Sequence, residues 1–250
     1  MKFSAILLFA ALLLLPARAA AGELIVSAAA SLTDAFKEIE TAFEAAHPGV
    51  DAILNLAGSG ALYRQISQGA PVDVFASANP LWMERAVEEG LASPDDVATF
   101  AQNSLVLAVP ANDPAQVKGV SDLEFERVTR IGIGTPRTVP AGQYAKAALS
   151  AHGLYAKLEP KMIFAGSVRQ TLDYLVRGEV DCAFVYRTDA LRSGDTVRIV
   201  EDIPLTAPVT YPLARLTHAP NHVEADAFVR FVLGLEGQRI LARWGFLPAR

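Results

Sequence analysis

Segments with the pattern of a β-strand alternate with segments patterned as amphipathic α-helices along most of this chain. An apolar strand is expected at residues 23–28, and the helix that follows from Ser31 has apolar residues every three or four positions. The same succession returns at 50–68 and again from 130 to 178. Strands and helices that alternate in this way are typical of layered proteins, so the pattern predicts an α/β fold.

The remaining patterns divide the chain into two lobes. Further strands are expected at 72–76, 103–109, 130–134, 161–165, 180–186, 197–200 and 209–216, and helices at 59–68, 80–90, 141–151, 167–178 and 223–244. The strand at 103–109 leads out of the first group of elements, and the strand at 209–216 leads back to it. We therefore predict one lobe of residues 22–103 plus 212–250 and a second lobe of residues 104–211.

The first 21 residues have the composition of a secretory signal peptide. Lys2 gives a basic start, residues 3–15 are apolar, and small residues at 17–21 follow Pro16 and offer a cleavage site. The apolar run is short for a transmembrane helix, although an anchor that is not cleaved is the alternative. No cysteine follows the run, which argues against a lipid anchor, and no later run is long and apolar enough to span a bilayer.

The chain has more acidic than basic residues. It carries 27 Asp and Glu against 22 Lys and Arg, a net charge of −5, and Lys2 and Arg18 lie in the predicted leader. This balance argues against nucleic acid or anionic lipid as a partner. It also means that an anionic ligand would have to be held by local dipoles and hydrogen bonds rather than by net charge.

Four predicted helix starts are candidates for an anion site: Ser31, Ser59, residues 140–142 and residues 166–168. The first N–H groups of a helix lack partners within the helix and carry partial positive charge. A serine there adds a hydroxyl donor, so several such starts facing each other would bind an anion without Lys or Arg. Plain capping explains any one of these junctions, because serine is a common N-cap residue. The hypothesis of a ligand rests on their combination.

Other kinds of site find less support. The serines lack the Gly-x-Ser-x-Gly and Ser-x-x-Lys contexts of nucleophiles. The four histidines, at positions 47, 152, 218 and 222, lack the spacing of a zinc site. Gly132 and Gly134 lack the third glycine of a dinucleotide-binding loop. The single cysteine, Cys182, is expected to be a buried strand thiol. A secreted hydrolase with paired carboxylates stays open, although the sequence singles out no such pair.

Two features of the sequence each have two possible interpretations. Tyr186 ends a predicted strand, where its ring packs in the core or its hydroxyl points into a cleft beyond the carboxyl end of the sheet. Residues 68–73 and 177–181 have similar sequences, each after a helix and before a strand. That similarity is either chance or a sign of two lobes built alike.

Taken in order and spacing, these motifs resemble those of the periplasmic molybdate-binding proteins of ABC importers. The similar stretches are 28–33, 62–66, 69–75, 103–106, 139–142, 168–169, 185–186 and 244–246, spread over nearly the whole chain after the leader. The resemblance implies the type II periplasmic binding protein fold. Such a protein has two α/β lobes, each a mixed sheet flanked by helices, with a ligand cleft between the lobes.

The resemblance also implies a ligand set. Ser31 and Ser59 would bind through hydroxyl and backbone N–H, Ala141 and Val168 through backbone N–H, and Tyr186 through its hydroxyl. These contacts reach the oxygens of the oxyanion and not the metal. The implied role is to capture molybdate, and also tungstate, in the periplasm and pass it to a membrane permease. A monomer without cofactor or catalytic activity is expected.

The chemistry of molybdate agrees with this ligand set. Molybdate is a dianion with no proton at neutral pH, so it offers only hydrogen-bond acceptors, and a site made of donors satisfies it. Hydrogen phosphate keeps a proton, and an unpaired proton in a closed site costs about 1–3 kcal/mol. Sulfate follows the same logic as molybdate but is smaller, so a protein that binds sulfate or another oxyanion is the alternative. The loop at 135–137 lacks an acidic residue found in some relatives, and Gly58 and Gly60 replace more hydroxyl-rich neighbours.

Overall fold

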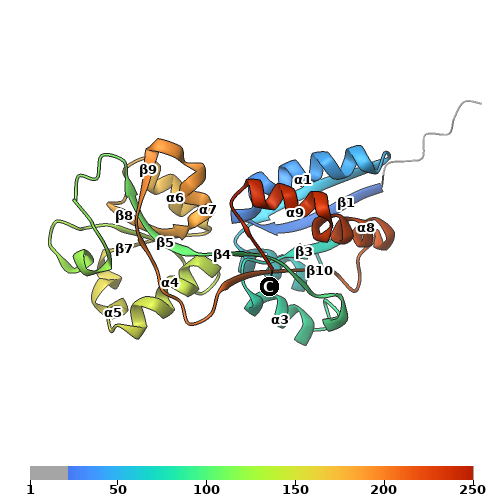
Figure 1. Ribbon diagram of the computed structural model, residues 1–250. Helices are drawn as coiled ribbons and strands as arrows, with labels where there is room; N and C mark the ends of the chain where they lie inside the picture. The colour runs from blue at the N-terminus through green and yellow to red at the C-terminus, as the bar shows by residue number, and fades with distance from the viewer. Residues whose placement is uncertain (1–21, 250) are drawn as a thin grey trace, which may run out of the picture.

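The computed structural model describes residues 22–249 and shows two α/β lobes side by side (Figure 1). One contains a six-stranded sheet with the order β11-β4-β10-β3-β1-β2, and the other a five-stranded sheet with the order β7-β6-β8-β5-β9. The predicted signal peptide, residues 1–21, lies outside the described residues. Within residues 22–249, the helices are all too short or too polar to cross a membrane.

The six-stranded sheet is mixed and is flanked by helices. Its strands are β1 (Gly22–Ala29), β2 (Val50–Ala57), β3 (Val74–Ala76), β4 (Ala98–Asn103), β10 (Val209–Arg215) and β11 (Leu247–Pro248), and its helices are η1 (Ala30–Leu32), α1 (Thr33–Ala46), α2 (Ser59–Ser67), α3 (Pro80–Glu88), η2 (Pro94–Asp96), α8 (His222–Leu233) and α9 (Leu235–Arg243). Strand β1 pairs parallel with β2 and β3, whereas β10 pairs antiparallel with β3 and β4. The C-terminal helices α8 and α9 lie beside α1 (Figure 1), where the rings of Phe43 and Phe228 are 5.1 Å apart.

The five-stranded sheet is also mixed. Its strands are β5 (Leu105–Pro110), β6 (Ile131–Gly134), β7 (Met162–Ala165), β8 (Cys182–Tyr186) and β9 (Val197–Asp202), and its helices are η3 (Val120–Glu124), α4 (Pro140–Ala151), α5 (Tyr155–Leu158), η4 (Glu159–Lys161), α6 (Val168–Val176), α7 (Arg187–Arg192) and η5 (Gly194–Thr196). Strand β6 pairs parallel with β7 and β8, and β5 pairs antiparallel with β8 and β9. The predicted two-lobe fold with mixed sheets is therefore confirmed.

The chain crosses between the sheets twice. The segment 103–109, predicted as one strand, is two strands: β4 ends at Asn103 in the first sheet, and β5 begins at Leu105 in the second. The return crossing lies between β9 and β10. Strand β10 pairs with β4 from Val209 onwards, three residues before the lobe boundary that we predict after residue 211. The assignment of residues to lobes remains a prediction.

The two sheets share one internal construction. In the first, β1 lies between β2 and β3, and in the second, β6 lies between β7 and β8. An aspartate precedes the third strand of each set. Asp73 Oδ2 accepts the N–H of Ile25 at 2.8 Å, and Asp181 Oδ2 accepts the N–H of Arg130 at 2.8 Å. The similarity of residues 68–73 and 177–181 thus reflects two lobes built alike.

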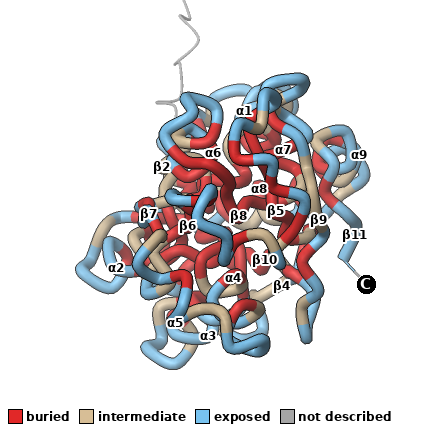
Figure 2. Tube along the Cα trace, turned by 90° about the vertical axis from the view of Figure 1, so that its left-hand side faces the viewer, coloured by how far each residue is buried: buried red, intermediate tan, exposed pale blue. Residues whose placement is uncertain are grey.

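The core follows the strands. Buried residues, red in Figure 2, run along β5, β8 and the inner helix faces, while the outer loops are exposed. Cys182 begins β8 with no exposed surface, as predicted, and burial raises the pKa of its thiol. This thiol is therefore a core side chain and not a nucleophile.

Candidate functional site

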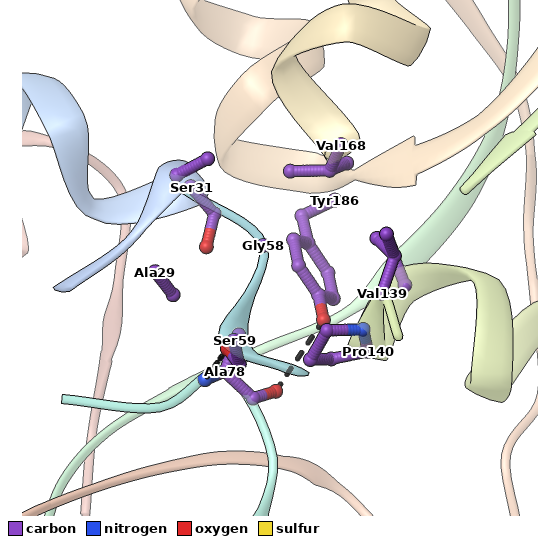
Figure 3. A pocket seen from close by; sticks show the side chains of 11 residues that line it. Ala29, Ser31, Gly58, Ser59, Ala78, Val139, Pro140, Val168 and Tyr186 are labelled. Carbon is purple, nitrogen blue, oxygen red and sulfur yellow. Dashed lines mark hydrogen bonds between the residues drawn. The ribbon is translucent and has the colours of Figure 1, made fainter. Parts of the chain in front are cut away.

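A small pocket lies between the lobes, and all five predicted ligand residues line it (Figure 3). The lining residues are Ala29, Ala30, Ser31, Gly58, Ser59 and Ala78 from the first lobe and Val139, Pro140, Ala141, Val168 and Tyr186 from the second. None of these lining side chains carries a charge. The pocket therefore favours an occupant that needs hydrogen bonds rather than a counter-charge.

Equivalent strands bring the five residues together. Ser31 follows β1, Ser59 follows β2, Ala141 follows β6 and Val168 follows β7, and Tyr186 is the last residue of β8. In open α/β sheets, ligands bind beyond the carboxyl ends of the strands. Ala78, which follows β3, also lines the pocket, so each lobe contributes the ends of three equivalent strands to it.

Three α-helices begin at the pocket. Ser59 is the first residue of α2, Val168 is the first residue of α6, and Ala141 lies in the first turn of α4. The first backbone N–H groups of a helix have no partner within it and carry partial positive charge. These three starts consequently offer hydrogen-bond donors and a favourable potential for an anion.

Plain capping, the alternative explanation of these junctions, does not apply to Ser31 or Ser59. Gly58 is the N-cap of α2, and Ser31 lies inside η1, ahead of the start of α1 at Thr33. By contrast, Ser167 does cap α6, since its Oγ accepts the N–H of Gln170 at 3.2 Å. The hydroxyls of Ser31 and Ser59 are thus not used by their own helices and remain available to a ligand.

Each of these two serine oxygens accepts a hydrogen bond from the first lobe. Ser59 Oγ accepts the N–H of Ala78 at 3.0 Å, and Ser31 Oγ accepts the hydroxyl hydrogen of Tyr211 at 3.2 Å. A hydroxyl carries one hydrogen of its own to donate. Because both oxygens are already acceptors, both hydrogens are left for another partner.

Tyr186 contributes its hydroxyl to the pocket, and its ring also packs in the core. The ring lies 5.9 Å from that of Tyr211, and the hydroxyl donates to the carbonyl oxygen of Ala78 at 3.4 Å (Figure 3). Complete burial raises the pKa of Tyr186 well above 10, so the hydroxyl keeps its hydrogen. Both interpretations of this residue therefore hold.

Polar contacts join the lobes around the pocket. The N–H of Gly60 donates to the carbonyl of Thr138 at 2.9 Å, an approach that a Cβ at position 60 would block, because it would lie 2.6 Å from that oxygen. The side-chain amide of Asn79 donates to Gln143. These two hydrogen bonds connect the lobes next to the pocket residues Ser59 and Ala78.

An ion-pair cluster beside the pocket also spans the lobes. Arg169, next to Val168, lies 2.7 Å from Asp34 Oδ2 in the first lobe and 2.8 Å from Asp189 Oδ1 in the second, and Arg192 also contacts Asp34. Complete burial raises the pKa of Asp189 to about 7, although Arg169 and Arg192 oppose this effect. Sequence reasoning missed this cluster. Its only signal was Arg169 within a motif at a predicted helix start.

The other candidate residues have structural roles. His47 Nδ1 lies 3.0 Å from the carbonyl of Phe43 at the end of α1, and His222 contacts Arg215. A Cβ on Gly134 would lie 2.5 Å from Val139, so the glycine permits close packing of strand on helix. Within residues 22–249, no three His, Cys, Asp or Glu side chains are grouped as a metal site.

Comparison with known proteins decides the family. Residues 24–247 match the family described as bacterial extracellular solute-binding protein. The chain belongs to this family. Among its relatives, molybdate-binding protein ModA of Escherichia coli (strain K12) is 36% identical over 90% of this chain and 89% of that protein. YvgL of Bacillus subtilis (strain 168), whose name describes an ABC transporter substrate-binding lipoprotein, is 36% identical over 89% of this chain and 85% of that protein. The resemblance to periplasmic molybdate-binding proteins is thereby confirmed.

Solved structures share the fold of this solute-binding protein. The periplasmic molybdate-binding protein of Azotobacter vinelandii has a TM-score of 0.80 at 22% identity, covering 91% of this chain and 100% of that one. The sulfate-binding protein SubI of Mycobacterium tuberculosis H37Rv has a TM-score of 0.79 at 21% identity, covering 91% and 87%. Proteins with different cargoes thus share this architecture, and the fold alone does not identify the ligand.

Proposed function

We propose that this solute-binding protein captures molybdate in the periplasm and delivers it to the permease of an ABC importer. The observation that supports this best is the pocket itself. Helix starts and hydroxyls from both lobes converge on one small space whose lining bears no charge. Relatives at 36% identity include a molybdate-binding protein and an ABC transporter substrate-binding protein.

In this proposal the anion is held by neutral donors alone. Ser31 and Ser59 donate through hydroxyl and backbone N–H, Ala141 and Val168 through backbone N–H, and Tyr186 through its hydroxyl. A hydrogen bond to a charged group is worth about 1.5–3 kcal/mol. The summed free energy of these hydrogen bonds is larger than the free-energy cost of association, which is about 4 kcal/mol or more. Tight binding of a fully deprotonated dianion follows.

The proposal includes no chemical reaction and no cofactor. Molybdate or tungstate is cargo, and the pocket's residues bind its oxygens without coordinating the metal. The protein acts as a monomer, residues 1–21 serve as its export signal, and nucleic acid is not a partner. The two serines act as donors and not as nucleophiles, since neither Oγ is bonded to a histidine or a carboxylate in the part of the chain that the structure describes.

Sulfate is the competing cargo, because it is also a dianion without a proton. Isothermal titration calorimetry of the protein without residues 1–21 decides between them, with molybdate as titrant and sulfate or phosphate in large excess. We expect one-to-one binding of molybdate that survives both competitors. Binding of sulfate alone would keep the receptor and change its cargo. Absence of heat with every anion would contradict an oxyanion receptor.

Two serines, one in the pocket and one outside it, provide matched variants for a test of the donor assignment. Ser59→Ala removes a donor from the pocket, whereas Ser93→Ala removes a hydroxyl that accepts the N–H of Asp95 at the start of η2, outside the pocket. Ser59→Ala should weaken molybdate binding, and Ser93→Ala should leave it unchanged. Equal affinities in the two variants would show that the donor assignment is wrong.

A further inference from the structure

A chain of buried hydrogen bonds runs from the crossing between the lobes to the pocket. Asn103 is the last residue of β4, Tyr211 lies beside it in β10, and Ser31 lines the pocket. The side-chain amide of Asn103 donates to Tyr211 Oη at 3.2 Å, and Tyr211 Oη donates to Ser31 Oγ at 3.2 Å. All three side chains are buried, so water does not replace these partners.

Asn103 determines which atoms donate and which accept along this series of hydrogen bonds. The backbone N–H of Ser104 donates to Asn103 Oδ1 at 2.9 Å, and a backbone N–H can only donate. The amide oxygen of Asn103 therefore faces Ser104, and its NH₂ group faces Thr188 and Tyr211. The two hydrogens of this NH₂ group are directed at Thr188 Oγ1, at 2.9 Å, and at Tyr211 Oη.

The orientation of the Tyr211 hydroxyl in turn determines the orientation of the Ser31 hydroxyl. Because the Tyr211 oxygen receives a hydrogen from Asn103, its own single hydrogen goes to Ser31 Oγ. Burial raises the pKa of Tyr211 far above its usual value, so this hydrogen is retained. Ser31 Oγ is thereby an acceptor on the protein side, and its hydrogen is directed into the pocket. The N–H of Ala78 has the same effect on Ser59.

We propose that Asn103 and Tyr211 are positioning residues that turn the hydroxyl hydrogen of Ser31 toward the ligand and so make the pocket reject oxyanions that carry a proton. This inference rests on the proposed function of the pocket as an oxyanion receptor. With both serine hydrogens directed inward, neither serine offers hydrogen phosphate a lone pair for its proton. The part of the selectivity against phosphate that comes from Ser31 thus depends on two residues that do not line the pocket.

Tyr211→Phe tests this directly, because it removes the hydroxyl and keeps a ring that packs 5.4 Å from Phe246 and 6.2 Å from Phe100. Ser31 Oγ is then free to turn and accept a proton. We expect molybdate and sulfate to bind about tenfold more weakly, the usual effect of disturbing one hydrogen bond to a charged group. Phosphate, measured by competition, should lose less or gain, so its affinity relative to sulfate should rise about tenfold or more.

Asn103→Asp tests the order of donors and acceptors in these hydrogen bonds with a side chain of nearly the same shape. A carboxylate accepts from Tyr211, so the tyrosine hydrogen turns away from Ser31, and Ser31 presents a lone pair to the pocket. The added charge weakens the binding of every dianion alike. The ratio of phosphate to sulfate affinity cancels that effect and should rise as in Tyr211→Phe. If one variant does not fold, as judged by circular dichroism, the other carries the test.

Tyr63→Phe is the matched control, because the Tyr63 ring is also buried in a core cluster, its hydroxyl donates to the exposed Glu89, and neither residue lines the pocket. It should leave all three affinities and their ratios unchanged. A purely structural role for Tyr211 would weaken sulfate, molybdate and phosphate equally, and an unchanged ratio in both variants would overturn the inference while the receptor stands. Failure of the wild-type protein to bind any of these anions would overturn the proposed function and, with it, this inference.

Discussion

The hydroxyl of Tyr186 links the two halves of the pocket. It belongs to the second lobe, yet it donates to the Ala78 carbonyl of the first at 3.4 Å, near the outer limit for a hydrogen bond. So long a bond contributes little, and the hydroxyl can turn to a ligand oxygen at small cost. This residue therefore both closes the pocket and serves as one of its donors.

Tyr186→Phe should weaken molybdate binding and leave the fold intact. The ring stays packed against Tyr211, and only a donor to a charged ligand is lost, which costs about 1.5–3 kcal/mol of binding free energy. Calorimetry measures the loss. Tyr174→Phe is the control, because Tyr174 accepts a hydrogen bond from Gln170 on the exposed face of α6. Wild-type affinity in Tyr186→Phe would remove this residue from the donor set.

Local sequence patterns singled out the helix starts as candidates and the family resemblance implied the ligand set, but neither identified the partners of these residues. Ser31, Ser59 and Tyr186 each follow or end an apolar strand, and that position is visible in the sequence. The bond from Tyr211 to Ser31 joins residues 180 positions apart, and that from Asn103 to Tyr211 spans 108. Neither can be inferred without the packing of β4 and β10. Capping does not explain the two serines, because Ser31 lies within a short 3₁₀ helix and Gly58 is the N-cap of α2.

At the scale of secondary-structure elements, one aspartate in each lobe, Asp73 and Asp181, binds the backbone of or beside the neighbouring strand. Asp181 precedes β8, and its Oδ2 accepts the N–H groups of Thr129 and Arg130 and the Thr129 hydroxyl ahead of β6. Burial alone would raise the pKa of Asp181, but these hydrogen bonds and the charge of Arg130 outweigh it and lower the pKa. The carboxylate form therefore stabilises the register of β6 beside β8.

Asp181→Asn should lower the free energy of unfolding at pH 7 by about 1 kcal/mol, the usual net value of such a bond. A carboxyl whose pKa is lowered in the folded state contributes stability above about pH 4, and that contribution is lost as the pH falls through the folded pKa. The difference between variant and wild type should accordingly shrink by pH 3. Urea unfolding at both pH values measures it, with exposed Asp195→Asn as control. A constant difference would contradict the ionic role.

The predicted strands and helices matched most elements because their apolar periodicity is strong. The segment 103–109 is predicted as a single strand because residues 105–109 are apolar, whereas the polar Asn103 and Ser104 mark the passage from β4 to β5. Apolar periodicity reports burial and not which sheet a strand joins. The change of sheet at this point is therefore a property of the assembled lobes.

Across the whole molecule, the lobes meet through contacts that close around the pocket. Asp34 of the first lobe pairs with both Arg169 and Arg192 of the second lobe. Its carboxylate lies in the first turn of α1, three residues after Ser31. Loss of this group leaves two cationic side chains without their partner across the interface, which disfavours contact between the lobes.

Asp34→Asn should therefore raise the dissociation rate of molybdate by about tenfold, since removal of one charged partner of a desolvated pair acts mainly on dissociation. Stopped-flow competition with tungstate measures that rate. Glu124→Gln is the control, because it removes an exposed ion pair with Lys157 within the second lobe. An unchanged rate in Asp34→Asn would show that the cluster does not hold the lobes together.

Binding across both lobes should also stabilise the whole protein. At a molybdate concentration of 100 times Kd, the free energy of unfolding rises by about 2.7 kcal/mol. For a chain of this size, that corresponds to an increase in Tm of roughly 5–10 °C. Differential scanning calorimetry with and without molybdate measures the shift, which should largely disappear in the Ser31→Ala, Ser59→Ala double variant. A full shift in that variant would place the ligand elsewhere.

The lining of the pocket has a consequence for unloading. Its donors are amides and hydroxyls, and none of them changes protonation near neutrality. The group near the pocket that does titrate there is Asp189, with a pKa of about 7, so acidification acts on the ion-pair cluster beside the pocket and not on the donors themselves. Release of an anion therefore depends on separation of the lobes rather than on a change in the donors that hold it.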